Sequence, residues 1–190
     1  MSETVAGRAG RRRYYLTTSR GMVLVRPARI ADIPAIVTLW DEANAWIASR
    51  GIIPELPPRE LGLILLERIP RGGVYVASRA LEIFGTITVD RDGHDVWDDT
   101  EGEAGYIHGF TVNRVSAGLG LELLRFAEAR VAKDMGLKLA RLDCSAFNPD
   151  LCDYYEHAGY RHRGNIALSD RTASRYEKLL SGECDAPDTV

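Results

Sequence analysis

The chain has 190 residues, a length that suits one domain of ordinary size. Hydrophobic residues make up 45% of it and charged residues 27%, the balance of a globular protein that buries a core. The formal net charge of −3 gives no reason to expect binding to nucleic acid or to a membrane.

The distribution of apolar residues and cysteines points to a cytoplasmic protein. No run approaches the roughly 18 apolar residues that a membrane span needs. No apolar stretch follows the first arginines, as it would in a secretory signal. The three cysteines follow no metal or disulfide spacing, and their odd count fits a reducing compartment. We therefore expect a cytoplasmic enzyme or binding protein without a bound metal.

The N-terminal segment differs in composition from the rest of the chain. Residues 1–21 carry five arginines against one glutamate and lack apolar periodicity, so we expect a flexible basic arm there. The folded domain is expected over residues 22–180, followed by a flexible tail over residues 181–190. Because so short a basic run is usually solvated, RNA binding through the arm is only a remote alternative.

Two helices are predicted in the first third of the chain. A short strand begins at residue 22 and is stopped by Pro27. Apolar residues then recur at three- and four-residue steps up to Gly51, which predicts a helix. Asp32 is the expected N-cap of this helix, and Pro34 lies in its first turn. A second helix is expected over residues 59–69.

The remaining elements are three successive strands followed by helices and strands in turn, and the whole order predicts an α/β fold with a mixed sheet. They are strands over 73–80, 81–90 and 104–112, a helix over 119–135, a strand over 138–146, a short helix over 149–159 and a last strand over 160–168.

Two glycines stand where the helix over 119–135 should begin. Gly118 and Gly120 are one residue apart, although a glycine inside a helix costs up to about 1 kcal/mol relative to alanine. One explanation is a tight turn; the other is a bare backbone whose N–H groups bind an anion at the helix N-terminus. The segment matches neither the Walker loop nor the Rossmann fingerprint, so the glycines alone leave both explanations open.

Two linked motifs surround this turn, FTVNRVSAGLGLELL at 110–124 and NPDLCDYYEHAGY at 148–160. Together they resemble the GNAT superfamily of acyl-CoA-dependent N-acetyltransferases. The matching residues are Phe110, Thr111, Val112, Gly118, Gly120, Leu123, Leu124, Asn148, Tyr155, Glu156, Gly159 and Tyr160. The resemblance implies a single α/β domain whose mixed, mostly antiparallel sheet is splayed between its fourth and fifth strands and flanked by helices.

The resemblance also implies acetyl-CoA as co-substrate, with no metal. Its pantetheine arm would hydrogen-bond the backbone edge at Phe110, Thr111 and Val112 like an added strand. Its pyrophosphate would contact the N–H groups of Ser116, Ala117, Gly118, Leu119, Gly120 and Leu121. The family's usual Arg or Gln is replaced by Val115, so either Arg114 supplies the cation or the N–H groups act alone. Asn148 either holds a bulged strand end or contacts the cofactor, and capping the helix that begins at Pro149 is compatible with both.

An acid and a base for transfer to an amine follow from the same resemblance. Tyr155 would donate a proton to the departing thiolate, with a packing tyrosine as the alternative. An alkyl amine is almost fully protonated at neutral pH, so a base is needed. His108, expected to share a strand face with Tyr106 and Phe110, is one candidate, with a structural histidine as its alternative. Glu103, at the strand entrance, is the other candidate. A backbone N–H of Phe110 or Val112 would stabilise the oxyanion.

We therefore expect an N-acetyltransferase that acts on a primary amine of a small molecule. The alternative is a non-catalytic sensor or partner module that binds acyl-CoA through the same fold. Residues 90–103 hold seven carboxylates against Arg91, so a cationic acceptor is one possibility and a solvated acidic loop the other. Trp46 and Trp97 either wall the acceptor pocket or pack in the core, and Cys144 is expected in the core. A homodimer is compatible with the sequence.

Overall fold

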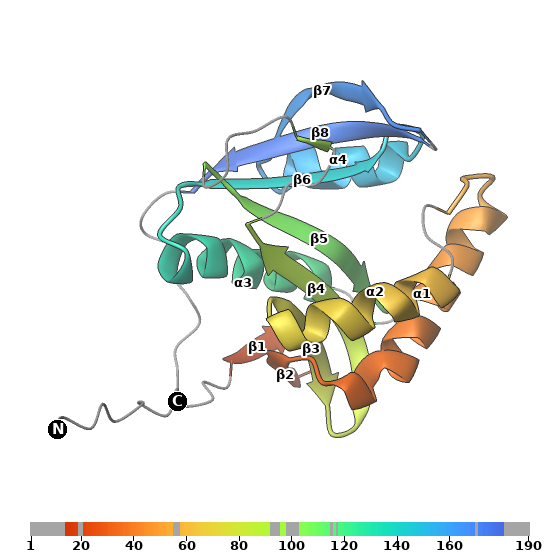
Figure 1. The fold of residues 1–190 in the computed structure, drawn as a ribbon, viewed down its shortest axis with the longest axis vertical. Helices are drawn as coiled ribbons and strands as arrows, with labels where there is room; N and C mark the ends of the chain where they lie inside the picture. Colours follow the sequence, from red (N-terminus) through yellow and green to blue (C-terminus); the bar gives the residue numbers. More distant parts are fainter. Residues whose placement is uncertain are drawn as a thin grey trace, which may run out of the picture.

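The fold is built on one eight-stranded sheet, shown in Figure 1. The computed structural model describes residues 14–18, 21–54, 58–91, 96–97, 103–114, 116, 118–169 and 171–180. The strands lie in the order β1-β2-β3-β4-β5-β6-β8-β7, and all neighbours are antiparallel except β5 and β6. Their bounds are β1 Tyr14–Thr18, β2 Gly21–Pro27, β3 Val74–Arg79, β4 Glu82–Asp90, β5 Gly105–Val112, β6 Leu139–Ser145, β7 Arg161–Ala167 and β8 Thr172–Leu179. The predicted mixed, mostly antiparallel α/β fold is confirmed.

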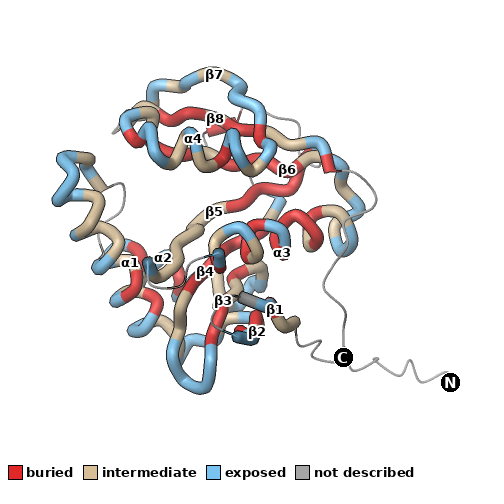
Figure 2. The backbone as a smooth tube through the Cα atoms, turned by 180° about the vertical axis from the view of Figure 1, so that it is seen from behind, coloured by how far each residue is buried: buried red, intermediate tan, exposed pale blue. Residues whose placement is uncertain are grey.

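Helices cover both faces of this sheet. They are α1 Ile33–Ser49, α2 Pro58–Arg71, α3 Leu119–Asp134 and α4 Pro149–His157. Val76 of β3 packs with α1 and α2, whereas the next residue, Ala77, joins the core formed with α3. Because successive side chains of a strand point to opposite faces, the two helical layers lie on opposite faces of the sheet. Figure 2 shows the buried residues gathered along the inner strands and α3. None of the described helices is long and apolar enough to cross a membrane.

Strand β1 corrects the expected extent of the N-terminal arm. The arm is expected to reach residue 21, but Tyr14–Thr18 form a strand that pairs with β2. Leu16 is buried, and the ring of Tyr14 packs edge-on against Phe126 with ring centroids 5.2 Å apart. These contacts come from α3, more than 100 residues away in the chain, and local composition does not reveal them.

Strand β8 is a second departure, because the sequence pattern predicts no strand after residue 168. β8 lies between β6 and β7 and pairs with β6 from Leu139 to Ser145. Its Lys178 is charged yet partly buried, because its Nζ lies 2.9 Å from both carboxylate oxygens of Glu128 on α3. The carboxylate of Glu128, supplied by a distant helix, offsets the cost of burying that charge. Because the segment of β8 is rich in charged residues, its sequence does not indicate a strand.

The start of α1 also differs in detail. Asp32 occupies the N-cap position but makes no side-chain cap to α1. Its carboxylate accepts hydrogen bonds from the guanidinium of Arg26, at 2.6 and 2.8 Å, and from the backbone N–H of Arg29. The hydrogen bond from Arg26 is the main reason why the pKa of Asp32 is lowered. Asp32 therefore ties the end of β2 to the start of α1.

Strands β5 and β6 separate after a short paired segment. They pair at Gly105↔Ala140 and Tyr106↔Arg141, and no pairing between these two fully described strands extends further. β5 stays paired with β4 as far as Val112, and β6 stays paired with β8 as far as Ser145. Figure 1 shows the two strands diverging toward their C-terminal ends. From Ile107 onward, no strand of the described part of the chain therefore pairs with this edge of β5.

Candidate active site

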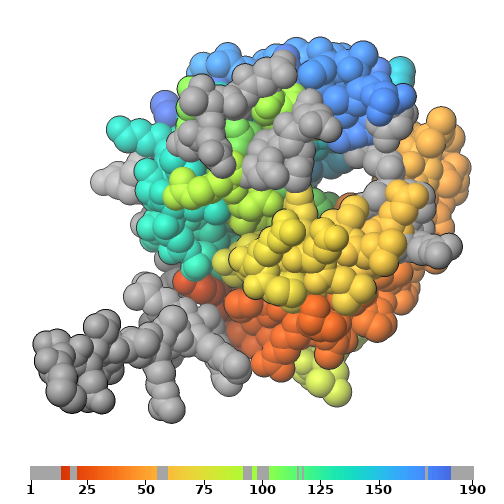
Figure 3. All heavy atoms as spheres, in the orientation of Figure 1, coloured from red at the N-terminus to blue at the C-terminus, as the bar shows by residue number. Residues whose placement is uncertain are grey.

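A cavity of about 140 Å³ lies between the diverging strands. Figure 3 shows the surface hollowed between the orange and yellow α1–α2 region and the blue C-terminal strands. β5 and β6 form its two sides, α4 closes one end, and α1 with the residues after it covers the other. The residues that line it are Trp40, Ala43, Asn44, Ile47, Ile52, Ile53, Pro54, Ile107, His108, Gly109, Phe110, Thr111, Asp143, Cys144, Ser145, Asn148, Leu151 and Tyr155.

A bulge in β5 shapes this cavity. The register shifts between Thr86 and Thr88 of β4, so that Gly109 and Phe110 together face the single residue Ile87. Gly109 has φ +53°, and a Cβ there would lie 3.3 Å from Oγ1 of Thr88. Both observations favour glycine at this position, because a side chain would be strained and crowded. A glycine in the middle of a predicted strand is the sequence signal for such a bulge.

The bulge overturns one expectation about β5. Tyr106 and His108 stack, with an interplanar angle of 13°, but Phe110 does not share their face. Phe110 instead packs on the α3 side of the sheet, with its ring centroid 6.4 Å from that of Tyr154. The extra residue in the bulge turns the strand over, because each added residue moves the following side chains to the opposite face.

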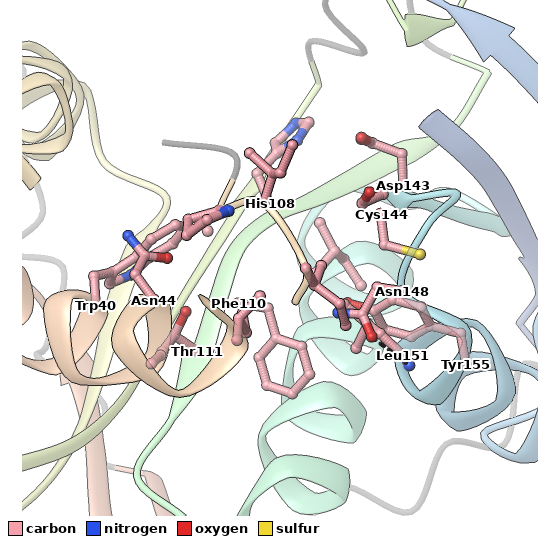
Figure 4. A pocket seen from close by; sticks show the side chains of 18 residues that line it. Trp40, Asn44, His108, Phe110, Thr111, Asp143, Cys144, Asn148, Leu151 and Tyr155 are labelled. Carbon is pink, nitrogen blue, oxygen red and sulfur yellow. Dashed lines mark hydrogen bonds between the residues drawn. The ribbon is translucent and has the colours of Figure 1, made fainter. Parts of the chain in front are cut away.

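His108 lines the cavity, as Figure 4 shows, and a carboxylate lies beside its ring. Its Nε2 lies 3.4 Å from Oδ1 of Asp90, the last residue of β4. The guanidinium of Arg68 donates to the other oxygen of Asp90 at 3.2 Å. Asp90 therefore links α2 to the histidine and can hold the imidazole in a defined orientation.

Glu103 is not brought to the cavity. Its carboxylate lies 3.9 Å from the guanidinium of Arg141, and its side chain is 55% exposed. It precedes β5 and is absent from the residues that line the cavity.

Tyr155 and Asn148 reach the cavity from α4. Tyr155 is 4% exposed, and its ring contacts those of Tyr154, Tyr160 and Tyr176. Asn148 is the N-cap of α4, and its Oδ1 accepts the backbone N–H of Leu151 at 3.3 Å. Capping and a place in the cavity wall are thus compatible, and the backbone N–H of Asn148 donates to the carbonyl of Ser145, the last residue of β6, at 3.1 Å.

The tryptophan in the cavity wall is Trp40 of α1, not Trp46 or Trp97. The indole N–H of Trp40 is buried and has no hydrogen-bond partner among the described residues. Trp97 is 9% exposed and packs with Tyr106 in a separate core cluster. Trp40 follows the same apolar spacing as its neighbours on α1, so periodicity alone does not distinguish a cavity residue from a core residue.

The two glycines of the turn serve different purposes. Gly118 has φ +84° and precedes α3, so it makes the left-handed turn, and nothing lies within 4 Å of a Cβ built on it. Gly120 has ordinary dihedrals, but its Cβ would lie 2.9 Å from the hydroxyl oxygen of Tyr154. The tight turn therefore explains Gly118, and close packing against α4 explains Gly120.

The Gly120 contact gives a testable stability difference. Gly120→Ala is expected to lower the free energy of unfolding by about 1–2 kcal/mol, because the added methyl overpacks the contact with Tyr154. Removing that hydroxyl in the double variant Gly120→Ala/Tyr154→Phe should restore most of the loss. Gly62→Ala in α2 is the control, since its nearest neighbour would be 3.9 Å away and helix propensity should raise stability. Denaturant unfolding measures all three, and a Gly120→Ala protein as stable as wild type would contradict the packing argument.

The turn uses some of the N–H groups that an anion would need. The N–H of Ser116 donates to the carbonyl of Asn113, and the N–H of Leu119 donates to the carbonyl of Ser116. No described residue accepts a hydrogen bond from the N–H of Gly120 or Leu121, which belong to the first turn of α3. The first-turn N–H groups and the helix dipole thus remain suited to a phosphate.

Arg114 lies next to this turn but points to α1. Its guanidinium lies 4.0 Å from the ring centroid of Trp46, and that of Arg50 lies 5.0 Å from the same ring. Arg50 also pairs with Asp150 of α4 at 2.6 Å. The pair joins the end of α1 to the start of α4 beside the cavity.

Several predicted features fall outside the described residues. They are the arm over 1–13, the tail over 181–190, Val115, Ala117, Asp92, Asp95, Asp98, Asp99 and Glu101. Within the described part of the chain, no group of three or more His, Cys, Asp or Glu side chains is arranged to hold a metal ion.

Comparison with known proteins agrees with this geometry. Residues 38–160 match the model of the Acetyltransferase (GNAT) family. No curated protein matches the chain significantly. A GNAT-family acetyltransferase from Listeria monocytogenes has the same fold, with a TM-score of 0.67 and 23% identity over 87% of this chain and 99% of its own.

Two further solved structures have names that state an acceptor. A variant of the spermidine N-acetyltransferase SpeG from Vibrio cholerae aligns with a TM-score of 0.59 and 16% identity over 83% of this chain and 93% of its own. A putative phosphinothricin N-acetyltransferase aligns with a TM-score of 0.59 and 19% identity over 84% of this chain and 99% of its own. At these identities the likeness establishes the fold alone.

Proposed function

The chain belongs to the GNAT acetyltransferase family, and we propose that it transfers an acetyl group from acetyl-CoA to a primary amine of a small molecule. The observation that carries the proposal is the cavity between β5 and β6, where His108 and Tyr155 line opposite sides of one space. Family membership makes the chain an acyltransferase. The acceptor and the roles of individual residues are our proposal.

The fit of acetyl-CoA rests on two features of the chain. Among the described residues, no strand pairs with the second edge of β5 from Phe110 to Val112, so its backbone groups are suited to a pantetheine arm bound as an added strand. The first turn of α3 offers backbone N–H groups to the pyrophosphate, with Gly118 leaving the approach open. Acetyl-CoA supplies the activated thioester. Arg114 would have to leave the ring of Trp46 to assist.

We assign His108 the role of general base. It lines the cavity, whereas Glu103 is half-exposed and pairs with Arg141. An imidazole titrates near neutral pH and can take a proton from an ammonium group directly or through water. Asp90, which contacts Nε2, would keep the ring oriented with Nδ1 toward the proton that it removes.

We assign Tyr155 the role of general acid. It lines the cavity beside Asn148 and Leu151, and its ring packs against the rings of Tyr154 and Tyr176. Once the amine has attacked, the hydroxyl would give its proton to the departing sulfur. A backbone N–H at the bulge, that of Phe110 or Val112, would stabilise the charge on the carbonyl oxygen.

The base assignment predicts a change in the pH–rate profile. Activity should rise with pH as the imidazole becomes neutral, so His108→Ala should flatten or shift the acidic limb of kcat/KM. Glu103→Gln is the matched control and should keep the limb of the wild-type protein. If the acidic limb of kcat/KM is unchanged in His108→Ala and is lost in Glu103→Gln, the base is Glu103.

The acceptor class follows from the apolar wall that α1 forms opposite α4. α1 contributes Trp40, Ala43 and Ile47, whereas the carboxylate of Asp143 on β6 already pairs with the guanidinium of Arg171 at 2.8 Å. An amine on an alkyl segment suits this apolar wall. A cationic acceptor would gain further from the carboxylates over residues 90–103, of which Asp90 and Glu103 already pair with cationic side chains.

Measuring free CoA release with a matched amine series tests the proposed function. We expect turnover with a monoamine and a diamine of one chain length, and much less with the corresponding amino carboxylate. If the acidic segment attracts cations, kcat/KM for the diamine should fall as salt rises. Replacing Asp98, Asp99 and Glu101 together by their amides should then raise KM more than it lowers kcat.

Two results would count against parts of this proposal. A preferred acceptor with net negative charge, or a salt-independent kcat/KM, would overturn the cationic class. Binding of acetyl-CoA without CoA release on any amine would instead indicate a non-catalytic acyl-CoA-binding module.

A further inference from the structure

Two thiols meet at the wall of the cavity. Sγ of Cys144 on β6 and Sγ of Cys152 on α4 are 3.7 Å apart. Cys144 is 3% exposed and lines the cavity, as Figure 4 shows, and Cys152 is half-buried behind it. The contact exists because α4 follows β6 after a short turn, in which the backbone N–H of Asn148 donates to the carbonyl of Ser145 at 3.1 Å.

The helix that carries Cys152 also carries the proposed acid. Tyr155 lies three residues after Cys152, and Leu151 and Tyr155 of this helix line the cavity. Sγ of Cys152 also lies 3.9 Å from the carbonyl oxygen of Ser145, another residue of the wall. A change at Cys152 is therefore transmitted directly to the wall.

We propose that Cys144 and Cys152 are an oxidation-sensitive pair of thiols. On oxidation they form a disulfide, which weakens the binding of acetyl-CoA in the cavity. The oxidant is hydrogen peroxide, which reaches Cys144 through the cavity that this residue lines. One thiol loses its proton and its sulfur attacks a peroxide oxygen, which breaks the O–O bond and gives a sulfenic acid; the hydroxide that leaves takes up the proton and becomes the first water. The second thiol attacks the sulfenic sulfur, forms the S–S bond and releases a second water. Two thiols thus lose two electrons and two protons, and one hydrogen peroxide becomes two waters.

Closing the disulfide moves the cavity wall. A disulfide bond is about 2.05 Å long, so the two sulfur atoms must approach by roughly 1.6 Å. β6 is paired with β8 along its whole length, so the helix α4, which is not part of the sheet, is the element expected to move. Asn148, Leu151 and Tyr155 would move with it and narrow the cavity. Formation of the disulfide does not rest on the proposed function. The loss of acetyl transfer that would follow from a narrowed cavity does rest on it.

The test uses the full chain with Cys184→Ser, which removes the third cysteine. After hydrogen peroxide treatment, we expect a mass loss of two hydrogens and a peptide that joins Cys144 to Cys152. Calorimetry should show at least a tenfold loss of acetyl-CoA affinity, and dithiothreitol should restore it. Cys152→Ser in the same background is the control, because it cannot close the bond and should keep its affinity at the same peroxide dose.

Three other results would overturn the disulfide switch, and a fourth would overturn only the proposed function. Oxygen addition to the cysteines without a joined peptide, or a joined peptide with unchanged affinity, would overturn the switch. An equal loss of affinity in Cys152→Ser would also overturn it, because the loss would then not come from the bond. A protein that shows the reversible disulfide and the affinity loss but acetylates no amine would support the switch and overturn only the proposed function.

Discussion

Replacing Gly118 by Asp is expected to lower the affinity for acetyl-CoA by about 100-fold or more. A carboxylate about 5 Å from a phosphate repels it by roughly 3 kcal/mol at an effective dielectric constant near 20. The repulsion, not bulk, carries the effect, because nothing lies within 4 Å of a Cβ at this position. The fold should survive, since Asp is among the residues that tolerate the left-handed conformation that Gly118 adopts, with φ +84°.

Gly118→Asn is the matched control for this experiment. Asn has the same shape and the same tolerance of a positive φ but carries no charge. We expect a loss of affinity several times smaller than with Asp, measured by calorimetry on both folded variants. If Asp and Asn weaken binding equally, the effect comes from backbone conformation; if neither does, the glycine turn is not part of the site.

Replacing Tyr155 by Phe is expected to lower kcat by about 100-fold while acetyl-CoA affinity stays near that of the wild-type protein. A general acid typically contributes a factor of this order, and Phe keeps the ring contacts with Tyr154, Tyr160 and Tyr176. Steady-state kinetics and calorimetry measure the two quantities separately. An unchanged kcat would remove Tyr155 as the acid.

Tyr154→Phe is the control at the adjacent position. Burial, with a further contribution from Glu128, raises the pKa of Tyr154 to about 12, so its hydroxyl stays protonated at neutral pH. That hydroxyl is buried and has no hydrogen-bond partner among the described residues. Removing it should therefore leave kcat within a few-fold of wild type. A loss in Tyr154→Phe as large as in Tyr155→Phe would mean that the acid assignment is not specific.

The linked motifs at 110–124 and 148–160 predict the family, the turn before α3 and the start of α4 from the sequence alone. These features are local, because a left-handed glycine, a proline in a first helical turn and an apolar period act on neighbouring residues. Gly118 and Asn148 accordingly have the conformation and the cap that the sequence indicates. The roles of His108 and Tyr155 come from the resemblance and stay predictions.

Contacts between distant segments were decided only by the tertiary structure. The strand β8 depends on pairing with β6 and on the Glu128–Lys178 pair, and neither leaves a periodic pattern in its own segment. The choice of Trp40 for the cavity wall and the meeting of Cys144 with Cys152 depend on how α1 and α4 pack against the separated strands. Periodicity shows which side of an element is apolar, but the neighbour that covers that side is chosen by the packing of the whole chain.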